Sequence, residues 1–179
     1  MNLFDRISEW WFAITHGLQR CVIKEFKREL NMPIDVTEFL SEQSVSETLR
    51  LIDDPIFNGS PALLCKWVTD HIHYRPEVSS VVIGDFWKMA SETIIDGAGD
   101  CEDGAILLAN MMLAAGGKSW KIFVAVFAEP RHVAVVYDGR LYDWTRPDLR
   151  FVPKDWVCSY MFNSRNSYTT KERVALWKK

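Results

Sequence analysis

The sequence predicts an α+β domain in which a buried central helix packs on an antiparallel sheet. Helix-like segments come first along the chain, and three strand-like runs follow at residues 121–127, 132–137 and 140–144. The last two runs are joined by Asp138-Gly139, the preferred residue pair for a two-residue hairpin turn. These two runs are therefore expected to pair as neighbouring antiparallel strands.

The length and composition fit one globular domain. The chain has 179 residues, of which 48% are hydrophobic and 25% charged, enough for one core and too few for two. A net charge of −3 gives no general attraction to nucleic acid or to an anionic membrane. No apolar run of about 18 residues is present that could span a membrane.

The N-terminus and the cysteines predict a cytoplasmic location. The apolar N-terminal stretch contains Asp5, Arg6 and Glu9 and lacks a small-residue cleavage site, so it is a poor secretory signal. The four cysteines are widely spaced and form no CxxC pair, which favours reduced thiols.

The strongest helical pattern is SETIIDGAGDCEDGAILLANMMLAAGG, residues 91–117. It predicts a short helix that ends at Gly97, then a second helix that is capped by Asp100 and stops at Gly116. Residues 105–115 are almost continuously apolar, and a helix that is apolar all round is a buried one. Earlier helices are expected at 4–30, 46–52 and 61–74.

Cys101 stands in the first turn of this buried helix. The unpaired N–H groups and the positive dipole end there favour a thiolate, which predicts a pKa below the ordinary value of about 8.5. Asp100, Glu102 and Asp103 oppose that effect, so a cationic imidazole is needed nearby.

His132 and Asp143 supply an imidazole and a carboxylate on the predicted hairpin. A two-residue turn pairs Tyr137 with Arg140, which makes His132 and Asp143 diagonal neighbours on one face of the sheet. A one-residue slip would place them on opposite faces. We expect a hydrogen bond between the two side chains, with the other imidazole nitrogen directed at the Cys101 sulfur. A thiol, a base and a group that orients the base are the parts of nucleophilic acyl transfer.

The segments GAGDCEDGAILLANMMLAAG and RHVAVVYDGRLYDWT resemble the transglutaminase-like superfamily of cysteine enzymes, and its bacterial transglutaminase-like cysteine proteinases most of all. The resemblance covers roughly residues 66–145. It implies a papain- or transglutaminase-like fold, with residues 61–179 as the catalytic core and residues 1–60 as a helical segment packed on the same domain. It also implies Cys101 as nucleophile, His132 as base and Asp143 as the orienting carboxylate.

The same resemblance bears on the oxyanion donors and on calcium. The upstream element Asp85-Phe86-Trp87 fits, and the Trp87 indole N–H is a candidate oxyanion donor beside the backbone N–H of Cys101; it could equally be a cleft wall. The sequence departs from the usual pattern at Lys88 and Ala90. Some relatives hold calcium with acids beside the nucleophile. The residues that correspond are Asp100, Glu102 and Asp103, which could instead cap the helix.

Three functions remain open at this level. A peptidase or amidase that acts on a protein or peptide and needs no cofactor is favoured, following the proteinase-like branch. The alternatives are a transglutaminase that forms isopeptide bonds and a catalytically silent interaction module. The residues themselves do not decide between water and an amine as acyl acceptor.

Overall fold

The structure is a computed structural model that describes residues 18–21, 26–29, 32–52, 58–76 and 87–170. Its helical elements are η1 (Val36–Leu40), α2 (Glu42–Leu51), α3 (Pro61–His71), α4 (Ala90–Asp96), α5 (Cys101–Ala114) and η3 (Ser119–Lys121). Its strands are β1 (Leu18–Cys21), β2 (Phe26–Glu29), β3 (Met32–Ile34), β4 (His73–Tyr74), β5 (Ala98–Gly99), β6 (Ile122–Glu129), β7 (His132–Tyr137), β8 (Arg140–Tyr142), β9 (Val157–Phe162) and β10 (Ser167–Thr170).

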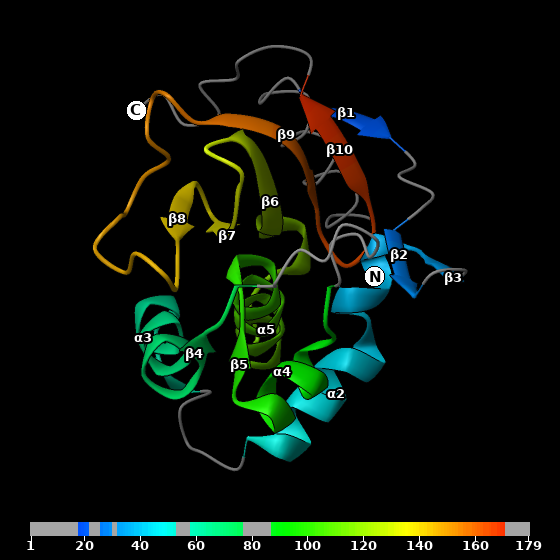
Figure 1. Cartoon of the computed structure of the whole chain (residues 1–179), viewed down its shortest axis with the longest axis vertical. Coiled ribbons are helices and arrows are strands. Elements are labelled where there is room, and N and C mark those ends of the chain that lie inside the picture. Colours follow the sequence, from blue (N-terminus) through cyan, green and yellow to red (C-terminus); the bar gives the residue numbers. More distant parts are fainter. Residues whose placement is uncertain (1–17, 22–25, 30–31, 53–57, 77–86, 171–179) are drawn as a thin grey trace.

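Six of these strands form one sheet in the order β1-β10-β9-β6-β7-β8. Every neighbouring pair in it is antiparallel. The helices gather on one side of this sheet (Figure 1). The predicted combination of helices with an antiparallel sheet is therefore confirmed.

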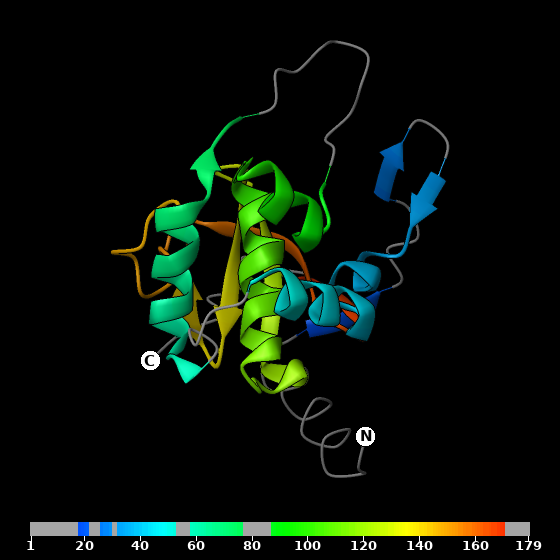
Figure 2. The same cartoon turned by 90° about the horizontal axis from the view of Figure 1, so that it is seen from below.

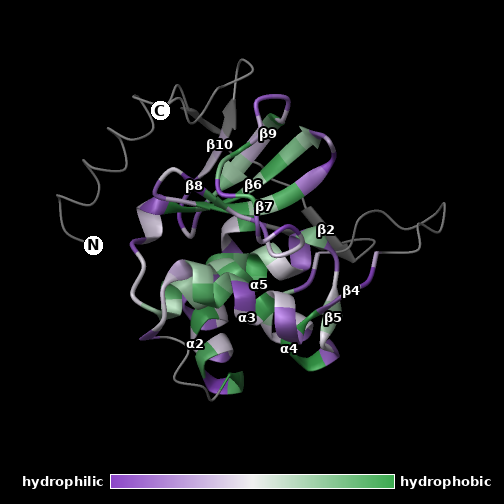
Figure 3. Ribbon diagram, turned by 90° about the vertical axis from the view of Figure 1, so that its left-hand side faces the viewer, coloured by the Kyte–Doolittle hydropathy of each residue, from purple (hydrophilic) through white to green (hydrophobic). Residues whose placement is uncertain are grey.

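Helix α5 lies at the centre of the molecule. Figure 2 shows it between α3 on one side and α2 on the other, with strands of the sheet behind it. Every residue from Glu102 to Met112 is buried, and the helix packs on β6 and β7. Figure 3 shows hydrophobic residues along α5 and along the strands that face it. An apolar surface on all sides explains this position, because each side needs a cover that excludes water.

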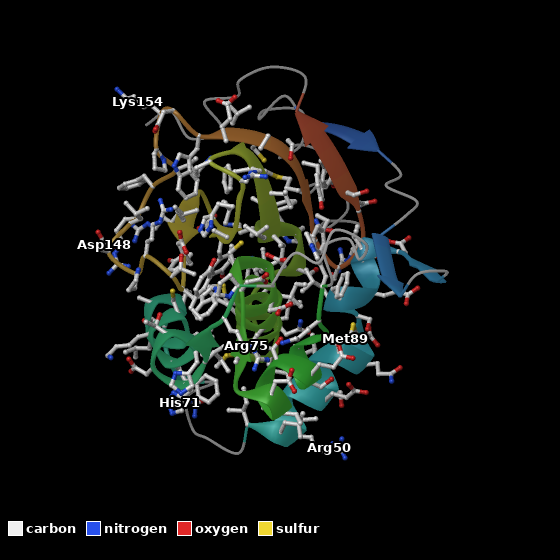
Figure 4. The ribbon with its side chains drawn as sticks, viewed as in Figure 1. Arg50, His71, Arg75, Met89, Asp148 and Lys154 are labelled. Atoms are coloured by element: carbon white, nitrogen blue, oxygen red, sulfur yellow. The ribbon has the colours of Figure 1, made fainter. Side chains whose placement is uncertain are left out.

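Strands β6 and β7 are apolar on both faces because both faces are covered. Ile122 and Val124 of β6 point towards α5 and join the core between helices and sheet. Phe123 and Phe127 point the other way and pack with Trp156 in a second apolar cluster. Side chains of the long connection between β8 and β9 cover that second face, and Figure 4 shows Asp148 and Lys154 on the outer side of this connection.

The helix boundaries follow the local signals closely. Helix α3 begins at Pro61 behind Ser60, as expected, but ends at His71, and β4 begins after the cap residue Ile72. Helix α4 ends at Asp96 and is capped by Gly97, whose φ of 60° is left-handed. None of the helices in the described ranges is long and apolar enough to cross a membrane.

The helical expectation for residues 18–30 is wrong where the structure describes that segment. Residues Leu18–Cys21 pair with β10 and Phe26–Glu29 with β3. Pairing with the distant strand β10, and of β2 with the adjacent strand β3, overrides the weak helical spacing of these residues. The expected helix over residues 4–17 lies outside the described residues, and the division of the chain at residue 60 stays a prediction.

The hairpin between β7 and β8 has the predicted turn and register. Asp138 and Gly139 have φ angles of 48° and 81°, which are those of a type I′ turn. Tyr137 is paired with Arg140, and Val135 with Tyr142.

We expect Gly139→Val to lower the free energy of unfolding by about 1–2 kcal/mol, because a β-branched residue is strained at positive φ. Asp138→Gly is the matched control at the other turn position. It relieves a positive φ and loses only an exposed ion pair with Lys121, so a change within about 0.5 kcal/mol is expected. Urea unfolding of both variants measures the difference. Equal stability of Gly139→Val and the parent would contradict the turn geometry.

Candidate functional site

His132 and Asp143 form a buried pair at one end of the hairpin. His132 begins β7, and Asp143 directly follows β8. The imidazole Nε2 and the carboxylate Oδ2 are 2.7 Å apart, and the two residues are 8% and 0% exposed. The hydrogen bond expected between these side chains is therefore present.

The second carboxylate oxygen of Asp143 is held by Thr145. Both the backbone N–H and the hydroxyl of Thr145 donate to Oδ1, at 3.0 and 2.8 Å. Burial alone would raise the pKa of Asp143, but the hydrogen bonds from His132 and Thr145 outweigh it and lower the pKa overall. Asp143 is thus a carboxylate at neutral pH, fixed in orientation by two residues.

The imidazole of His132 packs edge-on against the indole of Trp156. Their ring centroids are 5.3 Å apart with an interplanar angle of 78°. Arg146 lies over the same indole, 5.4 Å from its centroid. Aromatic contacts of this geometry fix the plane of a ring, so His132 is held by its carboxylate on one side and by Trp156 on the other.

Cys101 is the first residue of α5, and its sulfur has two hydrogen-bond partners. The thiol donates to Oε2 of Glu102 at 3.1 Å, and the backbone N–H of Val133 donates to the sulfur. Burial, followed by the charge and hydrogen bond of Glu102, raises the pKa of Cys101 well above its ordinary range. The expectation of a lowered pKa is therefore wrong, because burial and an adjacent carboxylate outweigh the helix N-terminus.

The Cys101 sulfur and the imidazole of His132 both lie at the start of β7, where the sulfur contacts Val133, the residue that follows His132. Val133 belongs to the core that contains α5, whereas the ring of His132 packs on Trp156 of the second cluster. The thiol is directed at Glu102, and an imidazole nitrogen directed at the sulfur stays a prediction. The roles of Cys101, His132 and Asp143 in catalysis stay a prediction.

The carboxylates beside Cys101 contact other groups of the protein and do not converge on one point. Asp103 is 2% exposed, and its carboxylate accepts the backbone N–H of Lys88 at 2.9 Å, with the Lys88 ammonium 3.6 Å away. The ammonium also reaches Asp96 and the carbonyl of Ala98, at 3.1 and 3.0 Å. In the described residues, no group of three His, Cys, Asp or Glu side chains is placed to hold a metal ion. A calcium site at Asp100, Glu102 and Asp103 stays a prediction.

The turn before Cys101 requires glycine at position 99. A Cβ there would lie 2.5 Å from the Cβ of Asp103.

Burial raises the pKa of Asp103 to about 6, despite the nearby Lys88 and the backbone N–H donors. The carboxylate of Asp103 thus connects the Gly97–Asp100 turn, the segment at Lys88 and the first turn of α5.

Trp87 is a core residue. It is 2% exposed, and its ring lies between those of Phe39 and Phe162, with centroid distances of 5.9 and 6.2 Å. The structure thus shows Trp87 packed against η1 and the sheet, and an oxyanion role for its indole N–H stays a prediction.

Several residues at the site escaped the sequence analysis. Trp144 and Thr145 directly follow Asp143, and that adjacency is a signal that could have singled them out. Trp156 and Tyr74 carry no such signal, because they are distant from the site residues in sequence and reach them only through the fold.

Some solved structures resemble this chain in fold. No family model matches the sequence, and no curated protein matches it. Among solved structures, EGTA-treated LapG of Legionella pneumophila matches with a TM-score of 0.55 and 19% identity, over 78% of this chain and 88% of that chain. Calcium-bound LapG of the same organism matches with a TM-score of 0.53 and 21% identity, over 74% and 80%. The fold is transglutaminase-like. At these identities the likeness to LapG concerns the fold alone.

Within this transglutaminase-like fold, we expect Lys88→Met to destabilise the protein more at pH 8 than at pH 5. The raised pKa of Asp103 means that its favourable contribution is complete below about 3.8 and is lost as the pH rises through about 6. Without Lys88 the ionised, buried carboxylate loses a partner, at a cost of about 1–3 kcal/mol at pH 8.

Thermal and urea unfolding at the two pH values measures this effect. Lys66→Met is the matched control, because its ion pair with Asp70 is exposed and should contribute less than about 0.5 kcal/mol at either pH. A loss for Lys88→Met that is the same at pH 5 and pH 8 would show that Asp103 does not titrate with the raised pKa.

We expect Glu102→Gln to speed alkylation of Cys101 by iodoacetamide at pH 8 by at least roughly tenfold. Removing a negative charge at hydrogen-bonding distance lowers the raised pKa of the thiol and increases its thiolate fraction. Mass spectrometry of the Cys101 peptide over time gives the rate. Glu38→Gln, an exposed change on η1, should leave it unaltered. A rate for Glu102→Gln equal to that of the parent would contradict the influence of Glu102.

Proposed function

We propose that this chain is a thiol-dependent acyl-transfer enzyme that cleaves amide bonds of a protein or peptide, a cysteine peptidase or amidase. The observation that carries the proposal is the buried 2.7 Å hydrogen bond between His132 and Asp143 at the start of β7, where the next residue, Val133, contacts the Cys101 sulfur. The likeness to LapG, a cysteine protease of the transglutaminase-like superfamily, supports it.

The first step is attack of the Cys101 sulfur on the amide carbonyl. The S–H bond breaks and an S–C bond forms, and the proton passes to the Nδ1 atom of His132, because Nε2 is committed to Asp143. The raised pKa of the Cys101 thiol favours its protonated form, so His132 acts as a general base during attack. This step requires the thiol to leave Glu102 when the substrate enters.

The negative charge on the carbonyl oxygen needs donors. The backbone N–H of Cys101 stands at the first position of α5, where N–H groups have no acceptor within the helix. When the C–N bond breaks, the proton on His132 moves to the leaving amine and a thioester remains on Cys101. Water then attacks the thioester with His132 as base. The S–C bond breaks, the acid is released, and the proton on His132 returns to the Cys101 sulfur.

Calcium enters none of these steps. LapG has been solved with calcium bound, but here Glu102 accepts the Cys101 thiol and Asp103 accepts from Lys88, so their oxygens do not converge. A calcium requirement and a cytoplasmic location both stay predictions.

Cys65, Cys101 and Cys158 form no disulfide in the described part of the chain.

Two other functions, a transglutaminase and an interaction module, differ from the proposed hydrolase in the fate of the thioester or in its absence. A transglutaminase would form the same thioester and pass the acyl group to an amine. A catalytically silent interaction module is favoured by one observation, the thiol whose pKa is raised and which is bonded to Glu102. Turnover decides between an enzyme and a module, and the product decides between water and amine.

The test is incubation of the full chain with a library of peptides, with and without a fluorescent primary amine. We expect new peptide termini in the parent and none in Cys101→Ala, which should still fold because Ala is a small residue that suits a helix. Amine incorporated at glutamine would indicate a transglutaminase. Absence of both products, with Cys101 as slow to alkylate as an ordinary buried thiol, would sink the enzymatic proposal.

Asp143→Asn should lose turnover by up to about 10⁴-fold while remaining folded, since the imidazole keeps a partner but can adopt the wrong tautomer. Asp148→Asn is the matched control, because this exposed residue lies on the outer side of the β8–β9 connection (Figure 4). Full activity in Asp143→Asn would show that another group orients His132.

A further inference from the structure

Trp144 joins the segment after β8, which carries Asp143, to the helix that carries Cys101. Its indole N–H donates to the backbone carbonyl of Cys101 at 3.2 Å. The side chain is 3% exposed and lies in the core that contains α5. Asp143 and Trp144 are consecutive, so one stretch of chain holds both the imidazole of His132 and the first turn of α5.

Gly104 shows how closely this indole approaches the helix. A Cβ at position 104 would lie 2.2 Å from Cε2 and 2.3 Å from Nε1 of Trp144. Glycine inside a helix costs about 0.5–1 kcal/mol relative to alanine, so its presence one turn after Cys101 needs a reason. The reason is space: without a side chain at 104, the indole lies directly on the helix backbone.

Two further contacts hold Trp144 itself. The Thr69 hydroxyl on α3 donates to the carbonyl oxygen of Trp144 at 2.7 Å. The ring of Tyr74, on the solvent side, lies 5.9 Å from the indole. Trp144 is therefore fixed from α3, from β4 and from α5 at once.

We propose that Trp144 is a positioning residue that sets the place of Cys101 relative to His132 and Asp143. This inference rests on the proposed function of Cys101 as nucleophile. Because a misplacement of about 1 Å can cost about 10²-fold in rate, a donor that fixes the first turn of α5 influences turnover without touching the substrate.

The test removes the N–H while keeping the ring. Replacement of Trp144 by benzothienylalanine, in which sulfur takes the place of the indole N–H, should lower kcat about tenfold and change KM less than about twofold. Alkylation of Cys101 by iodoacetamide should become about fivefold faster, because the loosened turn exposes the sulfur. Fluorotryptophan at the same position retains the N–H and should restore both parent values.

Controls separate positioning from general stability. Trp67→Phe alters a partly buried tryptophan packed against the same core, whose indole nitrogen has no hydrogen-bond partner in the described ranges, and should leave kcat and the alkylation rate unchanged. Thr69→Val provides a second variant and should act in the same direction as the Trp144 replacement, less strongly. Parent-like kcat and alkylation in both the benzothienylalanine protein and Thr69→Val would overturn the proposal. If the parent shows no turnover, the proposed function fails, and the alkylation rates still decide the role of Trp144.

Discussion

The structure depends on one constraint, the burial of a helix that has no polar side. Every residue from Glu102 to Met112 is covered, and α2, α3, α4 and the sheet each cover a part of α5. A cover from all directions places α5 at the centre of the molecule. Its first residue, Cys101, is then delivered to the end of the sheet at which β7 begins, beside the residues that interact with it.

Strand alternation gives consecutive residues at the site different contacts. At the start of β7, Val133 turns towards α5 and meets the Cys101 sulfur, while His132 packs on Trp156. After β8, Trp144 turns towards α5 while Asp143 reaches His132. Each contact therefore requires the same hairpin register, and a slip of one residue would exchange the faces and break all of them.

Burial and hydrogen bonding have opposite effects on the pKa of each titratable group near Cys101, and the larger of the two effects differs from group to group. For Asp143, donors on both oxygens outweigh burial and keep the carboxylate charged. For Asp103, burial outweighs Lys88 and the backbone donors. For Cys101, burial and Glu102 act together against the Val133 N–H. A helix N-terminus alone is too weak to reverse that sum, because its contribution to a charged group is typically 0.3–1 kcal/mol.

The sequence by itself determined the features that depend on neighbouring residues. These include the Asp138-Gly139 turn, the start of α5 at the Asp100 cap, the burial of that helix and the His132–Asp143 hydrogen bond. Each follows from a local rule: a turn type, a helix cap, an apolar surface or the two-residue alternation of a strand.

Only the tertiary structure decided the strands at 18–21 and 73–74, the enclosure of Trp87 and the seat of Trp144 on Gly104. It also decided that the thiol of Cys101 donates to Glu102. The two residues are adjacent in sequence, but the contact forms because burial keeps water from serving as the hydrogen-bond partner of the thiol. The physical reason is the same in each case. A contact between distant segments depends on the shape of both partners, and a single segment of sequence records the shape of only one.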